Sequence, residues 1–242
     1  MSSVLVAGGL RGIGKALVKQ LRASGQHQVI ATSRTARTWH QKDTGLIEAN
    51  LDLAADQSIE HFAAKLFGQV QQLDWVINCA GVLHNEQFQP EKTFQHWTAE
   101  RFEQSFRINC TGHLLLIKAL APLLLKSAHP LVASISARIG SIEDNQLGGW
   151  HAYRMSKAAL NQGMKTLGIE WARKYPKARI MLLHPGTTDT DLSKPFQRNL
   201  PDGQLQSPEE TAGMLLNQIN QHLKQGSAGT VFIDYRGDVI PW

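Results

Sequence analysis

Short apolar runs alternate with longer segments of helical periodicity along the whole chain. The runs are nearly continuous in apolar residues, which is typical of strands buried on both faces of a parallel sheet. They predict strands at 4–8, 28–33, 46–51, 73–81, 130–136, 178–186 and 230–235. Helices are predicted between them at 12–24, 55–70, 99–126, 151–175 and 208–225.

This alternation of strands and helices predicts a particular α/β architecture. We expect a single-domain, Rossmann-type, doubly wound parallel β-sheet of about seven strands with helices on both faces. The domain should span residues 1–242, because the pattern contains no linker, repeat or low-complexity tract. The least regular segments are 83–98, 138–150 and 187–206. Ligands of such sheets bind beyond the carboxyl ends of the strands, where these segments can close over them.

The composition excludes several classes of protein. The chain has 242 residues, of which 42% are hydrophobic and 19% charged, as in a globular domain. Its two cysteines lie in apolar or helical surroundings, which favours a reducing, cytoplasmic location over a disulfide framework. No apolar run approaches the roughly 20 residues of a membrane span. The ten histidines lack metal-ligand spacing, so no metal site is expected.

Charge is distributed unevenly along the chain, which has a net charge of +5. A transit peptide is also basic and poor in acids, but here a folding pattern begins by residue 3. A nucleic-acid surface would be expected to show aromatic interleaving or a known module, and neither is present. A site for a small polyanion fits better. The first 42 residues contain no Asp or Glu and hold Arg11, Lys15, Lys19, Arg22, Arg34, Arg37 and Lys42.

A glycine-rich turn follows the first predicted strand. The stretch "AGGLRGIG" places Gly8, Gly12 and Gly14 between a strand and a helix. Glycine permits a tight turn and lets the backbone approach a pyrophosphate, which then lies at the helix N-terminus. The position of this motif at the first strand–helix junction predicts a nucleotide-binding site.

The end of the second predicted strand indicates which nucleotide is preferred. NAD-binding sites usually carry an acid there, which holds the ribose hydroxyls. This chain has Ser33 at that position, followed by Arg34, and Arg11 adds a second cation from the glycine turn. Guanidinium groups bind phosphate through a fork of donors, so we expect NADP(H) as the cofactor. The alternative is that Arg34 is simply solvated.

The stretch "WHAYRMSKAAL" contains Tyr153 four residues before Lys157. On a helix this spacing places both side chains on one face. A lysine ammonium beside a phenol would lower the pKa of the phenol from its usual value of about 10. The pair is common in helices, however, and by itself does not establish catalysis.

Six motifs in order along the chain resemble the short-chain dehydrogenase/reductase family. They are "GGLRGIG", "LDL" at 51–53, "NCAG" at 78–81, "RINCTG" at 107–112, "YRMSK" at 153–157 and "PGTTDT" at 185–190. Within the family, residues 140–161 and the closing "IPW" are similar to C-factor and sniffer-type carbonyl reductases. The resemblance also implies a homodimer or homotetramer formed through the two long helices.

The resemblance implies roles for individual residues. Asp52 matches the acid that meets the adenine amino group, and Asn109 matches the helix asparagine that holds a water for proton relay. Tyr153 matches the general acid/base, and Lys157 the residue that binds the nicotinamide ribose. The implied cofactor contacts are Gly8, Arg11, Gly12, Ile13, Gly14, Ser33, Arg34, Asp52, Leu53, Asn78, Ala80, Gly81, Tyr153, Lys157, Pro185, Gly186, Thr188 and Thr190.

One position departs from the family pattern. The family usually ends its fifth strand with two serines, and the second of them orients the substrate oxygen. In "SISARIG" this second position is Ala137. Ser136 is the candidate that we favour, although a bulge would have to turn it, because adjacent strand residues point to opposite faces. Ser141 is another candidate, and a third interpretation is that the role is missing.

These observations predict an NADPH-dependent oxidoreductase that reduces a small-molecule ketone or aldehyde to an alcohol. Tyr153, Lys157, Asn109 and Ser136 would form the catalytic set. The alternative is a catalytically weak NADP-binding sensor or signalling protein. This alternative rests on Ala137, which stands where the family usually has a serine. The sequence does not identify the substrate.

Overall fold

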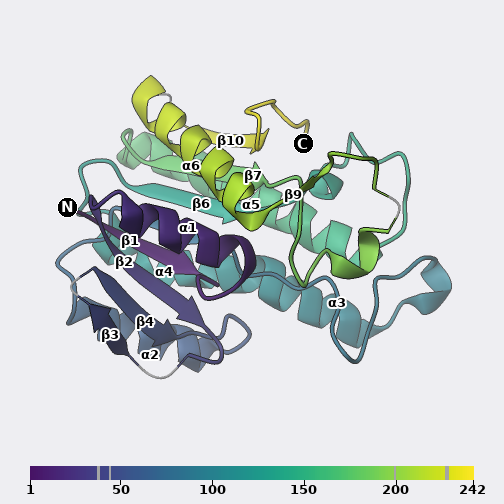
Figure 1. Cartoon of the computed structure of the whole chain (residues 1–242), viewed down its shortest axis with the longest axis horizontal. Helices are drawn as coiled ribbons and strands as arrows, with labels where there is room; N and C mark the ends of the chain where they lie inside the picture. Colours follow the sequence, from purple (N-terminus) through teal and green to yellow (C-terminus); the bar gives the residue numbers. More distant parts are fainter. Residues whose placement is uncertain (37–38, 44, 199, 227–228) are drawn as a thin grey trace.

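The computed structural model describes residues 1–36, 39–43, 45–198, 200–226 and 229–242. Its main sheet has eight strands in the order β10-β7-β6-β5-β1-β2-β4-β3 (Figure 1). All neighbouring strands pair in parallel except β3 and β4. The predicted doubly wound parallel sheet is therefore confirmed. Seven strands match the predicted ones: β1 Ser2–Ala7, β2 His27–Ser33, β4 Leu46–Asn50, β5 Trp75–Asn78, β6 Leu131–Ile135, β7 Arg179–His184 and β10 Gly229–Asp234.

The eighth strand, β3 (His40–Asp43), was not predicted from the sequence. It pairs antiparallel with β4 at one edge of the sheet. Its sequence, "HQKD", is polar and shows no apolar alternation. Short polar strands are typical of sheet edges, where they discourage pairing with other chains. Two further strands, β8 (Thr187–Thr188) and β9 (Leu205–Gln206), pair in a separate small sheet and connect the two ends of the irregular segment 187–206.

Helices cover both faces of the main sheet. On the face turned to the viewer in Figure 1, α1 (Gly12–Ala23) lies beside α6 (Pro208–Gln225). The other face is covered by α2 (Asp56–Phe67), α4 (Gly112–Leu124) and α5 (His151–Lys174). The single helix predicted at 99–126 is instead interrupted: α3 (Ala99–Phe106) and α4 are joined by a π-helical turn at Arg107–Thr111. The described residues also form three short 3₁₀ turns, at Phe94–His96, Arg138–Gly140 and Lys194–Phe196.

The apolar core forms two layers, one on each face of the sheet. In β1, Leu5 and Ala7 belong to the layer beneath α2, α4 and α5, whereas Val4 and Val6 belong to the layer beneath α1 and α6. All four residues are fully buried. A strand that buries both faces needs apolar residues at every position, which explains why these strands were recognisable as continuous apolar runs.

The strand order determines where a ligand can bind. β1 pairs with β2 on one side and with β5 on the other, so the order of the strands reverses beside β1. In doubly wound sheets ligands bind at this reversal, beyond the carboxyl ends of the strands. The glycine turn after β1 and the turn after β5 both lie there. No helix among the described residues is long and apolar enough to cross a membrane.

Candidate active site

The glycine turn after β1 has the backbone geometry that the sequence predicted. Gly8 and Gly12 adopt left-handed conformations, with φ of 74° and 49°. At Gly14, an added Cβ would lie 2.2 Å from the carbonyl oxygen of Gly8, so the turn has room only for glycine there. Arg11 is the N-cap residue of α1, and no acid occupies the first turn of this helix. Its N-terminal amides are therefore available to an anion.

The segment after β7 crosses this turn. An added Cβ at Gly12 would lie 3.2 Å from the side chain of Thr190. Gly186 has a φ of 73°, and Thr188 is buried with its hydroxyl 2.9 Å from that of Thr211. Pro185 and Gly186 follow β7 directly. The structure thus brings residues 185–190 and the glycine turn together, although they are far apart in the sequence.

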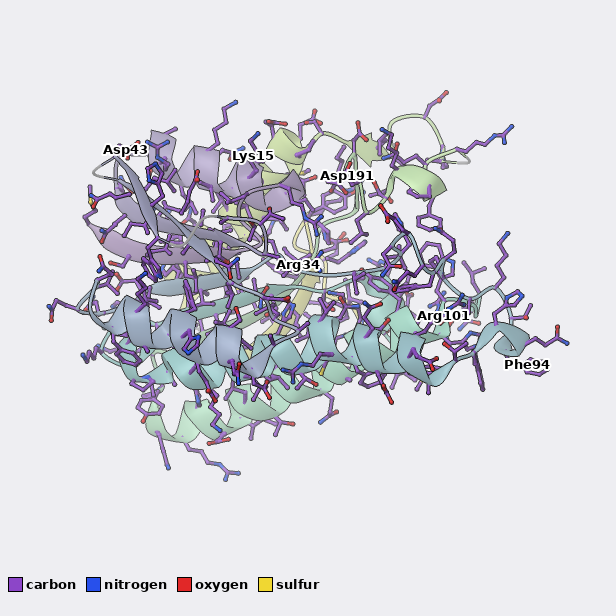
Figure 2. The ribbon with its side chains drawn as sticks, turned by 90° about the horizontal axis from the view of Figure 1, so that it is seen from below. Lys15, Arg34, Asp43, Phe94, Arg101 and Asp191 are labelled. Atoms are coloured by element: carbon purple, nitrogen blue, oxygen red, sulfur yellow. The ribbon has the colours of Figure 1, made fainter. Side chains whose placement is uncertain are left out.

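Arg34 is exposed directly after β2 (Figure 2). Its backbone carbonyl accepts a hydrogen bond of 2.7 Å from the side-chain amide of Asn50. The hydroxyl of Ser33 accepts a hydrogen bond from the backbone N–H of Ala36, which closes the same turn. Within the described residues no carboxylate pairs with the Arg34 guanidinium, so it is available to an anionic ligand. Arg37, another basic residue of this region, lies outside the described residues.

Asp52 and Leu53 follow β4. The carboxylate of Asp52 accepts a hydrogen bond of 2.9 Å from the backbone N–H of Ala54, and Asp52 is partly exposed. Leu53 is buried. At Gly112, the first residue of α4, an added Cβ would lie 2.5 Å from the carbonyl oxygen of Leu53. Only a glycine therefore lets α4 approach this turn so closely.

The turn after β5 is held by two asparagine side chains. The side-chain oxygen of Asn78 accepts a hydrogen bond of 3.1 Å from the N–H of Ala80. Asn109, which lies in the π turn, bonds Val82 twice: its side-chain oxygen accepts from the Val82 N–H, and its amide donates to the Val82 carbonyl, both at 2.8 Å. An added Cβ at Gly81 would lie 3.3 Å from that side-chain oxygen. Single π turns are frequent at functional sites.

Asn109 also connects this turn to α5. Its amide nitrogen lies 3.1 Å from the hydroxyl of Ser156, and that hydroxyl donates to the carbonyl of Tyr153 at 2.8 Å. Asn109 is fully buried. The polar face of α5 and the turn after β5 therefore form one hydrogen-bonded unit.

Tyr153 and Lys157 lie on the inward face of α5, as the spacing predicted. Their side chains are buried, and the Lys157 ammonium is 5.8 Å from the centre of the Tyr153 ring. It donates a hydrogen bond of 2.8 Å to the carbonyl of Ile135. Burial lowers the pKa of Lys157 to about 8. Burial also raises the pKa of Tyr153, because loss of water disfavours the charged phenolate, and this direction is opposite to the lowering expected from the sequence.

Each of the serines near the end of β6 is engaged in a hydrogen bond. The Ser136 hydroxyl is buried and donates to the side-chain oxygen of Asn161 at 2.6 Å. Asn161 in turn donates to the carbonyl of Gly140. The Ser141 hydroxyl accepts from the N–H of Asp144. In this arrangement the Ser136 hydroxyl donates its proton to Asn161.

Sequence reasoning missed one buried group, His113 in α4. It is fully buried, and its Nε2 donates a hydrogen bond of 2.9 Å to the carbonyl of Ala80. Its Nδ1 lies 3.4 Å from the Ser134 hydroxyl. Burial lowers its pKa to about 3, so the ring is neutral at physiological pH. The sequence contained no signal for this role, because histidine is intermediate between the residues that are usually buried and those that are usually exposed.

The three irregular segments meet beside the start of α5. His84 Nε2 donates to the carbonyls of Asp191 and Leu192, at 3.2 and 3.1 Å. The ring of Phe196 lies 5.7 Å from the ring of His84 and 4.7 Å from that of Trp150. The rings of His84, Phe196 and Trp150, one from each irregular segment, therefore form a single cluster. Trp150 lies three residues before Tyr153 in the sequence.

Among the described residues, no group of three or more His, Cys, Asp or Glu could hold a metal ion.

The sheet, the glycine turn and the polar face of α5 together define a nucleotide-binding α/β protein, and comparison with known proteins identifies its family. The short chain dehydrogenase family matches residues 2–201. A 1-hydroxy-2-glutathionyl-2-methyl-3-butene dehydrogenase from Rhodococcus sp. (strain AD45) is 30% identical over 222 residues, which cover 91% of each chain. The chain therefore belongs to the short chain dehydrogenase family.

Two further relatives match the subgroup that the sequence indicated. C-signal from Myxococcus xanthus is 36% identical over 140 residues, which cover 57% of this chain and 77% of C-signal. The NADPH-bound carbonyl reductase from chicken fatty liver has a TM-score of 0.81 and 26% identity, covering 100% of this chain and 94% of that chain. The resemblance to C-factor-like proteins and carbonyl reductases is thus confirmed.

The buried, neutral His113 predicts a specific pH dependence of stability. Its pKa is about 3 in the folded protein against 6.5 for the free side chain, so the unfolded chain binds more protons between these values. Stability from this site is lost as the pH falls below 6.5. Relative to His113→Gln, the wild-type free energy of unfolding should fall by about 2 kcal/mol between pH 6.5 and 4.5. Denaturant unfolding of both proteins at several pH values measures this, and parallel curves would contradict it.

Proposed function

We propose that this protein is an NADPH-dependent reductase of a small-molecule ketone or aldehyde, in which Tyr153 is the general acid and the chain forms one domain over residues 1–242. The observation that carries the proposal is the convergence of Asn109 and Lys157 on the turn that contains Gly81. An added Cβ at Gly81 would lie 3.3 Å from the side-chain oxygen of Asn109 and 3.8 Å from the ammonium of Lys157. The similarity to an NADPH-bound carbonyl reductase supports the same reaction.

The residues at the glycine turn fit a dinucleotide. The left-handed Gly8 and Gly12 and the close approach at Gly14 leave bare backbone beside the N-terminus of α1. The absence of an acid at Ser33 removes a repulsion, and the exposed Arg34 offers a fork of donors to a 2′-phosphate, which favours NADPH over NADH.

The remaining proposed contacts with the cofactor come from the other turns at the carboxyl edge of the sheet. From those turns they are Asp52, Leu53, Asn78, Ala80, Gly81, Pro185, Gly186, Thr188 and Thr190, and the glycine turn itself adds Arg11 and Ile13. When bound, NADPH supplies the hydride, and the protein's own groups position the carbonyl and handle the proton.

Tyr153 is suited to give up a proton in the reductive direction. Burial raises the pKa of its phenol, so the group is protonated before substrate arrives and can donate to the carbonyl oxygen. Lys157, with a pKa of about 8, is largely protonated near neutral pH and can stabilise the phenolate that forms. Asn109 hydrogen-bonds both Val82, in the turn after β5, and Ser156, in α5, so the turn and the helix stay at a fixed distance from each other.

A catalytically weak NADP-binding sensor is the second candidate, and the observation that favours it is Ala137, where the family usually has a serine. The hydrogen bond from the Ser136 hydroxyl to Asn161 adds to this argument, because Tyr153 is then the single donor that we assign to the substrate oxygen. NADPH consumption with a panel of activated carbonyls, such as isatin and diketones, separates the two functions.

Assembly as a homodimer or homotetramer stays a prediction of the family resemblance.

Cofactor choice is tested at Arg34. Arg34→Asp should weaken NADPH binding by at least about tenfold, since it removes a charge-assisted contact and adds a repulsion, and should affect NADH much less. Titration by quenching of intrinsic fluorescence measures both affinities. Arg173→Asp, at the exposed far end of α5, changes the net charge equally and is the control. Equal wild-type affinities for the two nucleotides would contradict the assignment.

The catalytic role of Tyr153 is tested by removing one hydroxyl. Tyr153→Phe should keep the fold and bind NADPH, while carbonyl reduction falls by about 10²–10⁴-fold, the usual range for a lost general acid. Tyr175→Phe, on an exposed ring at the end of α5, is the matched control. Single-turnover hydride transfer and cofactor affinity should be measured on the same samples. Wild-type reduction by Tyr153→Phe would show that the mechanism is wrong.

Ser136 is proposed to position its neighbours rather than to donate to the substrate. Ser136→Ala should therefore reduce turnover by less than about tenfold, whereas loss of a direct donor to the developing oxyanion costs about 10²–10³-fold. Steady-state kinetics on the variant decides between these values. A fall of about 10²-fold or more would assign Ser136 the donor role that the family serine has.

A further inference from the structure

The helix that carries Tyr153 begins in an unusual way. Its N-cap residue, Trp150, has a φ of 52° and a ψ of 43°, a left-handed conformation that bulky residues rarely adopt. Within the described part of the chain, the Trp150 side chain makes no capping hydrogen bond and the first turn of α5 contains no acid. The strained residue and the free amides of this turn must therefore be stabilised from another segment.

Glu91 is the residue that supplies this stabilisation. It lies in the segment before α3, 61 positions from Ala152, and is only 2% exposed. Its carboxylate accepts a hydrogen bond of 3.3 Å from the N–H of Ala152, and its backbone carbonyl accepts one of 2.6 Å from the N–H of Trp150. Glu91 therefore binds the backbone on either side of His151, the first residue of α5.

The charge of Glu91 suits this position. A carboxylate at a helix N-terminus interacts favourably with the positive end of the helix dipole. A buried charge without such partners would be costly, so the helix start is what makes the burial of Glu91 tolerable. The backbones also approach closely here, because an added Cβ at Gly149 would lie 3.6 Å from the Glu91 carbonyl oxygen.

We propose that Glu91 is a positioning residue for catalysis, which sets where α5 begins and thereby where Tyr153 and Trp150 lie. This inference rests on the proposed function of Tyr153. Ala152, which Glu91 binds, is the immediate neighbour of Tyr153, and Trp150 packs on Phe196 of the segment opposite. A shift of about 1 Å in a catalytic group can lower the rate by about 10²-fold, so the position of the helix start can affect the rate of the proposed reaction strongly.

Two substitutions separate the hydrogen bond from the mere presence of a side chain. Glu91→Gln keeps an acceptor oxygen and the shape, whereas Glu91→Ala removes the acceptor. Glu91→Ala should lower kcat at least about tenfold, and Glu91→Gln should restore most of the rate. The affinity for NADPH should stay within about twofold in both variants, since the proposed contacts to its phosphates lie on other elements. Glu100→Ala, an exposed acid in the first turn of α3, is the control.

A second measurement tests the same inference without turnover. Amide hydrogen exchange should increase over residues 150–154 in Glu91→Ala and not over the rest of α5. Unchanged exchange there, or an unchanged kcat, would overturn the proposal, and so would a failure of Glu91→Gln to rescue. A parallel loss of kcat and NADPH affinity would also overturn it, because it would indicate a general structural role. If Tyr153→Phe proves fully active while exchange responds as expected, the proposed function fails and the positioning of the helix start stands.

Discussion

The arrangement of the site depends on the side-chain amide of Asn109. It bonds the backbone of Val82 in both directions and reaches the hydroxyl of Ser156, so one residue joins the turn after β5, the π turn and α5. Neither an apolar side chain nor a carboxylate could donate and accept in this way. Because the amide is fully buried, each of its bonds would be costly to lose, and the three elements are held in one geometry.

Burial determines the charge state of the groups around this amide. It keeps His113 neutral, lowers the pKa of Lys157 to about 8 and raises the pKa of Tyr153. All three shifts have the same physical origin, which is the loss of water around an ionisable group. The phenol therefore holds its proton while the site is free. In the proposed reaction, the Lys157 ammonium would stabilise the phenolate, and NADPH, when bound, would supply the hydride.

The sequence was sufficient to predict the elements whose chemistry is local. Strands such as β1 bury both faces and so appear as continuous apolar runs, and the glycines after it are required by the turn itself. The polar strand β3 and the π turn in the predicted long helix left no such pattern, because each depends on a partner elsewhere in the chain. The direction of the Ser136 hydroxyl was likewise decided by Asn161, 25 residues away.

The same distinction separates the proposed catalytic groups from the residues that hold them. Tyr153 and Lys157 lie four residues apart on one helix, so their proximity follows from helix geometry. Glu91 reaches that helix from 61 residues away. Nothing local requires a glutamate at its position, and only the folded chain shows why its charge can be buried. The proposed chemistry of this site is thus encoded in short motifs, whereas the placement of its groups depends on long-range hydrogen bonds from irregular segments such as the one that contains Glu91.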